Sequence, residues 1–261
     1  MFLLGRRNFL RGATAIGVTA GLGAIKPLWA QTLDNRAVLD VIKKPIPSTG
    51  EMIPAVGLGS WITFNVGNDP VLRDQCANVM QAFFDGGGRM IDSSPMYGSS
   101  QDVIGYGLDK LGARDRVFST DKVWTSDDGA EQITETSDYW NIEKFDLLQV
   151  HNLVGINDNL PLLFYMKDAG RLRYVGVTTS HGRRTDDLIA VMKNTPLDFV
   201  QVTYNPVDRK VEDYLLPLAL ERGIAVIVNR PFQGGHLIDR LEGEKLPDFA
   251  AEIEVRSWAQ L

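Results

Sequence analysis

The chain has 261 residues, of which 44% are hydrophobic and 23% charged, and its formal net charge at pH 7 is −6. This composition is typical of a globular domain with a large core and excludes a disordered or fibrous chain. The acidic balance gives no sign of a nucleic-acid or anionic-membrane partner. The single cysteine, Cys76, excludes an intramolecular disulfide, and its helix-like surroundings predict a small core residue.

The first 30 residues have the features of an export signal. They contain four basic side chains and no acidic one, then a weakly apolar, glycine-rich stretch that ends at a small residue, Ala30. This stretch is too short and too rich in glycine to anchor the protein in a membrane. Arg6 and Arg7, followed by Phe9 and Leu10, resemble the twin-arginine motif, with a chance arginine pair on a general secretory signal as the alternative. We expect recognition by the twin-arginine export machinery and a periplasmic protein.

From residue 45 onward the chain repeats a short apolar run, a polar loop and an amphipathic stretch. The apolar runs, which we interpret as strands, are centred near residues 58, 91, 119, 148, 176, 202 and 227. Several of the helix-like stretches between them end in glycine, as helix C-caps do. Strands joined by single helices run parallel, so the pattern predicts an α/β fold of the (β/α)8 TIM-barrel type. A doubly wound sheet is the alternative, but the G-x-G-x-x-G turn typical of it does not occur.

Seven predicted strands leave the eighth strand and the last helix of such a barrel unaccounted for. The residues after the seventh strand are interpreted as a loop and a helix. A barrel without its last strand has two unpaired edges, so we expect either an incomplete sequence, which we favour, or another element that closes the gap. The predicted organisation is a signal peptide over 1–30, a linker over 31–44 and an incomplete barrel over 45–261.

Four polar residues occur at or just after the ends of three consecutive predicted strands: Asp92, Tyr97, Lys122 and His151. Chemistry in (β/α) barrels takes place at the C-terminal ends of the strands, and neighbouring strands lie about 5 Å apart. We therefore expect these side chains to converge. Each of them alone has an ordinary structural explanation, such as a turn or cap for Asp92 and surface packing for Tyr97.

The four residue types form a coherent acid catalyst. An unperturbed tyrosine has a pKa of about 10, which a nearby ammonium group lowers, and a carboxylate keeps that ammonium charged and in place. At about 4 Å and an effective dielectric of about 20, two unit charges interact by roughly 4 kcal/mol, or about three pKa units at the upper limit. The interpretation is that Asp92 tethers Lys122, that Lys122 lowers the pKa of Tyr97, and that His151 orients a substrate oxygen.

These segments resemble the aldo-keto reductase family, in the family's order, from about residue 54 to 235. The matching blocks are PAVGLGSW, GGRMIDSSPMYGSSQDVIGYGL, FSTDKVW, DLLQVHN, YVGVTTS and FVQVTYNP. The block around Asp92 and Tyr97 is the most specific. The resemblance implies NAD(P)H-dependent reduction of an aldehyde or ketone, in which Tyr97 protonates the carbonyl oxygen, His151 orients the carbonyl, and Asp92 and Lys122 complete the tetrad.

The resemblance also implies a cofactor, NADPH with NADH as the alternative, and a small-molecule carbonyl substrate. The implied cofactor contacts are Ser60, Thr178, Thr179, Gln201, Asn229, Arg230 and Phe232. Thr179 departs from the family's asparagine, and Asn229 stands where the family has a tyrosine that stacks on the nicotinamide. Trp61 and Trp124 would form flat apolar walls for the substrate, with core packing as the alternative for Trp124.

Two other hypotheses remain open: a non-catalytic barrel of the same fold that binds or senses a ligand, and an inactive truncated product. The retained tetrad favours the enzyme, whereas Asn229 favours the sensor. No metal site is expected, because the chain has three histidines, no paired cysteines and no H-E-x-x-H motif. The G-x-S-x-G motif of serine hydrolases is also missing from the sequence.

Overall fold

The structure is a computed structural model that describes residues 41–258, 260 and 261. The compact unit that contains the predicted barrel spans Lys43–Leu261. The predicted signal peptide and most of the predicted linker lie outside the described residues.

Seven parallel strands, each hydrogen-bonded to the next one along the chain, form the sheet. They are β3 (Leu58–Gly59), β4 (Met90–Asp92), β5 (Phe118–Val123), β6 (Phe145–His151), β7 (Leu172–Thr178), β8 (Phe199–Thr203) and β9 (Ala225–Asn229). Their positions and parallel order confirm the predicted barrel-type fold. Within the described part of the chain, β3 and β9 are the two ends of the sheet and are not paired with each other.

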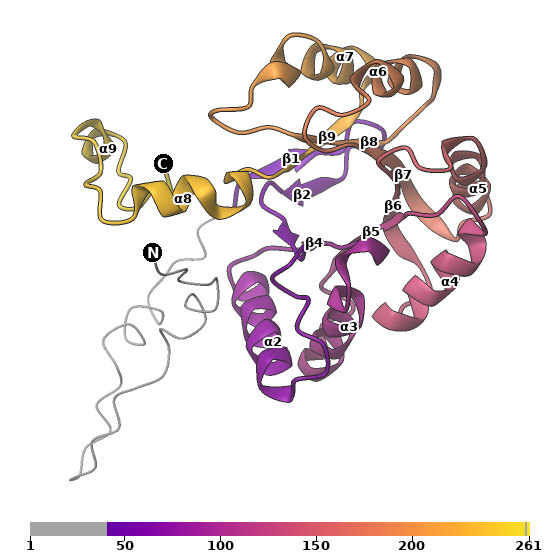
Figure 1. Cartoon of the computed structure of the whole chain (residues 1–261), viewed down its shortest axis with the longest axis horizontal. Coiled ribbons are helices and arrows are strands. Elements are labelled where there is room, and N and C mark those ends of the chain that lie inside the picture. The colour runs from indigo at the N-terminus through magenta and orange to yellow at the C-terminus, as the bar shows by residue number, and fades with distance from the viewer. Residues whose placement is uncertain (1–40, 259) are drawn as a thin grey trace, which may run out of the picture. The chain divides into compact units, whose positions relative to one another are not determined.

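Six helices alternate with these strands and lie on the outside of the sheet (Figure 1). They are α2 (Pro70–Asp85), α3 (Ser100–Leu111), α4 (Gly129–Trp140), α5 (Ile156–Asp168), α6 (Thr185–Asn194) and α7 (Leu215–Arg222), and two short helices follow β9, α8 (His236–Leu241) and α9 (Phe249–Glu252). Capping residues fix the ends of these helices. Asp69 caps the start of α2 by accepting from the backbone N–H groups of Val71 and Leu72. Gly112 ends α3 in the left-handed region at φ 56°.

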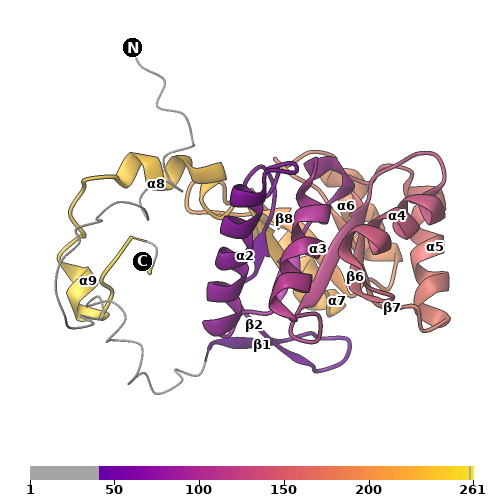
Figure 2. The ribbon, with the colours of Figure 1, turned by 90° about the horizontal axis from the view of Figure 1, so that it is seen from below.

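A hairpin of β1 (Lys43–Pro45) and β2 (Met52–Pro54), which the sequence analysis did not predict, precedes the barrel at one end of it (Figure 2). Ile46, in the turn of this hairpin, is completely buried in a core cluster with Phe118 and Phe199. Glu51 fastens the hairpin, because Tyr174 Oη donates to its carboxylate at 2.6 Å. The hairpin therefore packs against the starts of the strands and leaves their C-terminal ends open for a site.

Residues at alternate positions along three of the strands change from apolar to small or polar toward the C-terminal end. These stripes are Phe118–Thr120–Lys122 on β5, Tyr174–Gly176–Thr178 on β7, and Phe199–Gln201–Thr203 on β8. Because side chains at alternate positions share one face of a sheet, an apolar layer lies at the starts of the strands and a polar layer at their ends. Three of the predicted site residues, Lys122, Thr178 and Gln201, belong to this polar layer.

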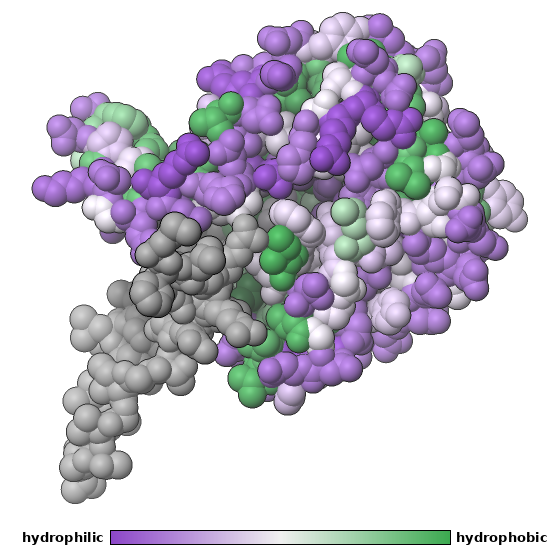
Figure 3. Space-filling model, viewed as in Figure 1, coloured by the Kyte–Doolittle hydropathy of each residue, from purple (hydrophilic) through white to green (hydrophobic). Residues whose placement is uncertain are grey.

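The face shown in Figure 3 is mostly hydrophilic, with separate apolar patches. None of the described helices combines the length and the apolar character needed to cross a membrane.

Candidate active site

A buried ion pair joins the ends of β4 and β5. Lys122 Nζ donates to Asp92 Oδ2 at 2.6 Å and to the backbone carbonyl of Ser93 at 2.7 Å. The Lys122 side chain is 0% exposed and that of Asp92 15% exposed. Burial, the largest single effect, would lower the pKa of Lys122. The charge and hydrogen bond of Asp92, together with the charges of Tyr97 and Asp121, outweigh burial and raise the pKa above its ordinary value. The structure therefore holds a charged amine at a fixed point beneath the loop that follows β4.

Tyr97 reaches this amine because a short 3-10 helix, Pro95–Tyr97, turns the chain back after β4. Lys122 Nζ lies 5.1 Å from the centre of the Tyr97 ring. The turn continues through Gly98 at φ 63°, where an added Cβ would also lie only 2.4 Å from Asn65 Oδ1. Glycine is thus required at this position both by the backbone conformation and by the space.

His151, the last residue of β6, completes the cluster. Its ring centre lies 5.9 Å from that of Tyr97 with the planes nearly perpendicular, and its Nδ1 lies 2.8 Å from Ser94 Oγ. Burial lowers the pKa of His151 to about 3, and the charge of Lys122 adds to this effect. The imidazole is therefore neutral at physiological pH.

Lys122 lowers the pKa of Tyr97, as expected, but the net pKa of Tyr97 lies above its ordinary value. Burial raises the pKa of Tyr97 above 10, and this effect exceeds the lowering by Lys122, while the charge of Asp92 acts in the same direction as burial. The predicted influence of Lys122 has the expected sign but does not set the net direction. Tyr97 is consequently a protonated phenol at neutral pH, and its proton is available for transfer.

The chain matches the model of the aldo/keto reductase family over residues 55–253. It belongs to this family. An aldo-keto reductase of Bacillus subtilis is 26% identical over 219 residues, which cover 76% of this chain and 64% of the relative. The NADH-specific methylglyoxal reductase of Escherichia coli is 24% identical over 253 residues, which cover 84% of this chain and 75% of the relative. The match thus spans less than two thirds of the first relative and three quarters of the second.

Solved structures of other proteins show the same fold. An aldo/keto reductase from Klebsiella pneumoniae, in complex with NADP and acetate, superposes with a TM-score of 0.64 at 24% identity, covering 78% of this chain and 73% of that one. The holo form of an aldo-keto reductase from Bacillus halodurans gives a TM-score of 0.64 at 19% identity, covering 80% of this chain and 71% of that one.

In this family member, two of the predicted cofactor residues extend the polar layer of the tetrad. Thr178 Oγ1 donates to Gln201 Oε1 at 3.1 Å, and Gln201 Nε2 donates to Asp92 Oδ1 at 3.1 Å. Asp92 therefore accepts from Lys122 through one oxygen and from Gln201 through the other. Thr179 follows Thr178 at the end of β7 and is also buried. The structure brings Thr178, Thr179 and Gln201 to the same end of the barrel as the tetrad.

Asn229 and Ser60 have structural partners that the sequence analysis did not foresee. Asn229 Oδ1 accepts from Thr203 Oγ1 at 2.6 Å and its Nδ2 donates to the Thr179 carbonyl at 3.1 Å, so its amide links three strand ends. Ser60 is 0% exposed, and its Oγ donates to the Asp92 carbonyl at 2.9 Å. The predicted contact of Ser60 with the cofactor stays a prediction, and the structure shows its hydroxyl bonded to the end of β4.

The remaining predicted residues lie on loops at the two ends of the sheet and after β5. The guanidinium carbon of Arg230 lies 5.8 Å from the centre of the Trp61 ring, which joins the loop after β9 to the loop after β3. Trp61 and Phe232 are exposed. Trp124 is also exposed and lies 6.5 Å from His151, between ring centres, so it belongs to the mouth of the barrel and not to the core.

Asp121 is a buried acid beside the tetrad that the sequence analysis missed. It accepts from Gln101 Nε2 at 3.0 Å and from Trp140 Nε1 at 2.7 Å, and it is completely buried. Burial raises its pKa to about 7. Its place next to Lys122 in an otherwise uncharged strand was the available signal.

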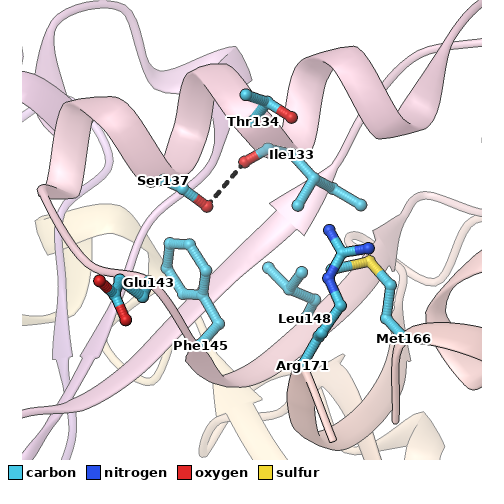
Figure 4. Close-up of a pocket in the computed structure, with 8 residues that line it drawn as sticks. All are labelled: Ile133, Thr134, Ser137, Glu143, Phe145, Leu148, Met166 and Arg171. Atoms are coloured by element: carbon cyan, nitrogen blue, oxygen red, sulfur yellow. Dashed lines mark hydrogen bonds between the residues drawn. The ribbon is translucent and has the colours of Figure 1, made fainter. Parts of the chain in front are cut away.

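A pocket of about 280 Å³ lies away from the tetrad, between α4, the first half of β6 and the segment from the end of α5 to the start of β7 (Figure 4). Its lining includes Phe145, Leu148 and Arg171. Phe145 begins the strand that His151 ends, so the pocket and the tetrad lie at opposite ends of β6. The Ser137 hydroxyl at this pocket already donates to the Ile133 carbonyl at 3.0 Å. This pocket contains none of the predicted site residues.

The low pKa of His151 predicts a pH-dependent contribution to stability. The unfolded chain binds a proton at this residue near pH 6.5, whereas the folded protein binds it near pH 3. The contribution is therefore fully present above pH 6.5 and is lost as the pH falls toward 3, by about 1.4 kcal/mol per pH unit. The variant His151→Gln lacks this penalty, so its free energy of unfolding should improve relative to the wild type by about 2 kcal/mol between about pH 7.5 and about pH 5.

Urea unfolding of both proteins at the two pH values measures this difference. Asp121, whose raised pKa acts in the opposite direction, is present in both proteins and cancels in the comparison. A difference in unfolding free energy that stays constant with pH would show that the folded protein protonates His151 as readily as the unfolded chain does.

Proposed function

We propose that this chain is an NAD(P)H-dependent reductase of small aldehydes or ketones. The observation that carries the proposal is the buried Lys122–Asp92 pair, 2.6 Å apart, held beneath the Tyr97 ring and beside a neutral His151. The family relationship supports it, as do relatives named NADH-specific methylglyoxal reductase and glyoxal reductase.

Each member of the tetrad has a distinct task in this proposal. The neutral imidazole of His151 orients the carbonyl by a hydrogen bond, and Tyr97 donates its proton to the carbonyl oxygen. The phenolate left on Tyr97 lies beside the Lys122 ammonium, which stabilises the new negative charge where it forms. Asp92 keeps Lys122 charged and in place. The product alcohol thus obtains its hydroxyl proton from Tyr97, which is later reprotonated from solvent.

The polar residues at the end of β7 and on β8 fit the amide end of a nicotinamide. Thr179 offers a hydroxyl, which both donates and accepts, and Gln201 Nε2 keeps one N–H beyond the bond it donates to Asp92. Thr178, Thr179 and Gln201 would therefore hold the carboxamide, and Arg230 would supply a positive charge for a phosphate. When bound, NADPH or NADH supplies the hydride that is added to the carbonyl carbon. Structural neighbours in complex with NADP and NADPH support the first of these cofactors, and the NADH-specific relative supports the second.

The proposal is tested by mixing the purified protein with NADPH or NADH and a panel of methylglyoxal, glyoxal and an aromatic aldehyde. Carbonyl-dependent loss of nicotinamide absorbance is the expected result.

A ligand-sensing barrel is the second candidate function. Asn229 favours it, because its amide is bonded to Thr203 and Thr179 and offers no ring to stack on a nicotinamide. Saturable cofactor binding without turnover of any carbonyl would favour that candidate over the reductase.

We further propose that the protein is exported to the periplasm by the twin-arginine route. Arg6 and Arg7, the weakly apolar stretch after them and Ala30 support this proposal. The double variant Arg6→Lys, Arg7→Lys should leave the protein in the cytoplasm, because the route reads the paired guanidinium groups and lysine does not reproduce their planar geometry. Fractionation of cells that express the full chain checks this. An unchanged periplasmic yield would favour the general secretory route.

A further inference from the structure

The hydroxyl of Ser94 connects the loop after β4 to the imidazole of His151. Ser94 Oγ lies 2.8 Å from His151 Nδ1, and it accepts from the backbone N–H of Met96 at 3.2 Å. Ser94 is 0% exposed and His151 5% exposed. Both partners of this bond are thus removed from solvent, and neither group can exchange its partner for bulk water.

The two contacts of Ser94 decide which group donates. A serine hydroxyl has one proton and two acceptor lone pairs, and the Met96 N–H uses one lone pair. If Nδ1 carried a proton and donated it to Ser94, the hydroxyl proton would need another acceptor, and the described residues provide none. A buried donor without an acceptor costs about 1–3 kcal/mol. The arrangement in which Ser94 donates to an unprotonated Nδ1 avoids this cost.

His151 is neutral at physiological pH, so its ring holds a single proton. With Nδ1 unprotonated, that proton is on Nε2, at the opposite edge of the ring. Within residues 41–258, Nε2 has no hydrogen-bond partner, and the exposed Trp124 and the Tyr97 ring flank the imidazole.

We propose that Ser94 is a positioning residue that holds His151 as the Nε2–H tautomer, so that Nε2 donates to the carbonyl oxygen of the substrate. The part that concerns the substrate rests on the proposed reductase function. The opposite tautomer would turn the Nε2 lone pair toward the carbonyl oxygen, and two acceptors repel each other. Ser94 thereby makes His151 a permanent donor without giving it a positive charge.

Nitrogen-15 NMR of histidine-labelled protein tests the tautomer without any reaction. The chain has three histidines, and the signals of His151 are identified by their loss in His151→Gln. In the wild type we expect a protonated, pyrrole-type shift for Nε2 and an unprotonated, pyridine-type shift for Nδ1, coupled to a slowly exchanging hydroxyl proton. A protonated Nδ1 in the wild type would overturn the proposal.

Two variants of equal shape test the role in the reaction. Ser94→Thr keeps the hydroxyl, whereas Ser94→Val replaces it with a methyl group, and both add the same extra bulk to a buried site. We expect Ser94→Thr to retain the wild-type tautomer and Ser94→Val to lose the Nδ1 hydrogen bond. The kcat/KM of Ser94→Val should be about tenfold below that of Ser94→Thr, the factor that corresponds to one hydrogen bond. Equal tautomers and equal rates in the two variants would refute the positioning role.

The two readouts separate this inference from the proposed function. If the wild-type protein has a protonated Nε2 and a hydrogen-bonded Nδ1 but reduces no carbonyl, the positioning role of Ser94 is supported and the reductase function is ruled out. If the protein reduces carbonyls but has a protonated Nδ1, the reductase function is supported and the positioning role of Ser94 is ruled out. If either variant fails to fold, the wild-type spectrum alone decides the tautomer.

Discussion

Replacing Tyr97 with phenylalanine is expected to lower kcat for carbonyl reduction by about 10²- to 10⁴-fold, the range that general acid catalysis contributes. The substitution removes only the phenolic oxygen, and the ring that packs edge-on against His151 remains. The other groups near Lys122 do not replace Tyr97 as the acid. His151 is neutral with a pKa of about 3, and Asp92 is occupied by its ion pair. Asp121 lies on the opposite face of β5, where it is bonded to Gln101 and Trp140. Steady-state rates with NADPH or NADH and the best carbonyl of the panel measure the loss.

The matched control is Tyr165→Phe, which removes the same atom from an exposed tyrosine on α5. Its rate should equal that of the wild type. The affinity of Tyr97→Phe for the cofactor should also stay within a small factor of the wild type, because the phenol acts on the substrate oxygen. If Tyr97→Phe turned over carbonyls at the wild-type rate, Tyr97 would not be the acid, and the main argument for the reductase would fail.

Replacing Asp92 with asparagine is expected to lower the free energy of unfolding by about 3–5 kcal/mol, as is typical when one partner of a buried ion pair is removed. The variant leaves the Lys122 ammonium in a place that is 0% exposed without its negatively charged partner, so only neutral oxygens such as the Ser93 carbonyl accept from it. The asparagine must also serve Gln201, whose Nε2 donates to Asp92 Oδ1. Urea unfolding near neutral pH, followed by far-UV circular dichroism, measures the change.

Two comparisons show whether burial is the cause. Asp74→Asn breaks the pair between Asp74 and Lys110, whose side chains are 47% and 42% exposed, and should cost far less than Asp92→Asn. The double variant Asp92→Asn, Lys122→Met removes both buried charges, so it should recover a large part of the stability lost in Asp92→Asn. If Asp92→Asn and Asp74→Asn cost the same, the pair at the site contributes no more than a surface ion pair.

The raised pKa of Tyr97 clarifies how the site works as an acid. A phenol with a lowered pKa would lose part of its protons at neutral pH, whereas the half-buried phenol of Tyr97 keeps its proton until a substrate oxygen accepts it. The charge of Lys122 then matters for the phenolate that forms during the reaction more than for the resting phenol. Lys122 Nζ lies 5.1 Å from the centre of the Tyr97 ring, close enough to stabilise the phenolate when it forms.

Much of the fold and the main cluster of the site were predictable from the sequence. Each of the seven strands is a short apolar run with its own turn residues, and glycines such as Gly112 and Gly223 mark helix ends. These signals are local, so they can be recognised without knowing which distant residues each segment contacts in the fold. The convergence of Asp92, Lys122 and His151 followed from topology alone, because consecutive parallel strands place their C-terminal ends side by side.

The tertiary structure decided the properties that depend on distant partners and on burial. Ser94 and His151 are 57 residues apart, Asn229 bonds to a carbonyl 50 residues away, and Tyr174 binds Glu51 across 123 residues, so no local pattern predicts these contacts. The net direction of the Tyr97 pKa shift also depends on the tertiary structure. The sequence identified Lys122 as the neighbouring charge, but the desolvation that outweighs this charge depends on how completely the folded barrel excludes water from the phenol.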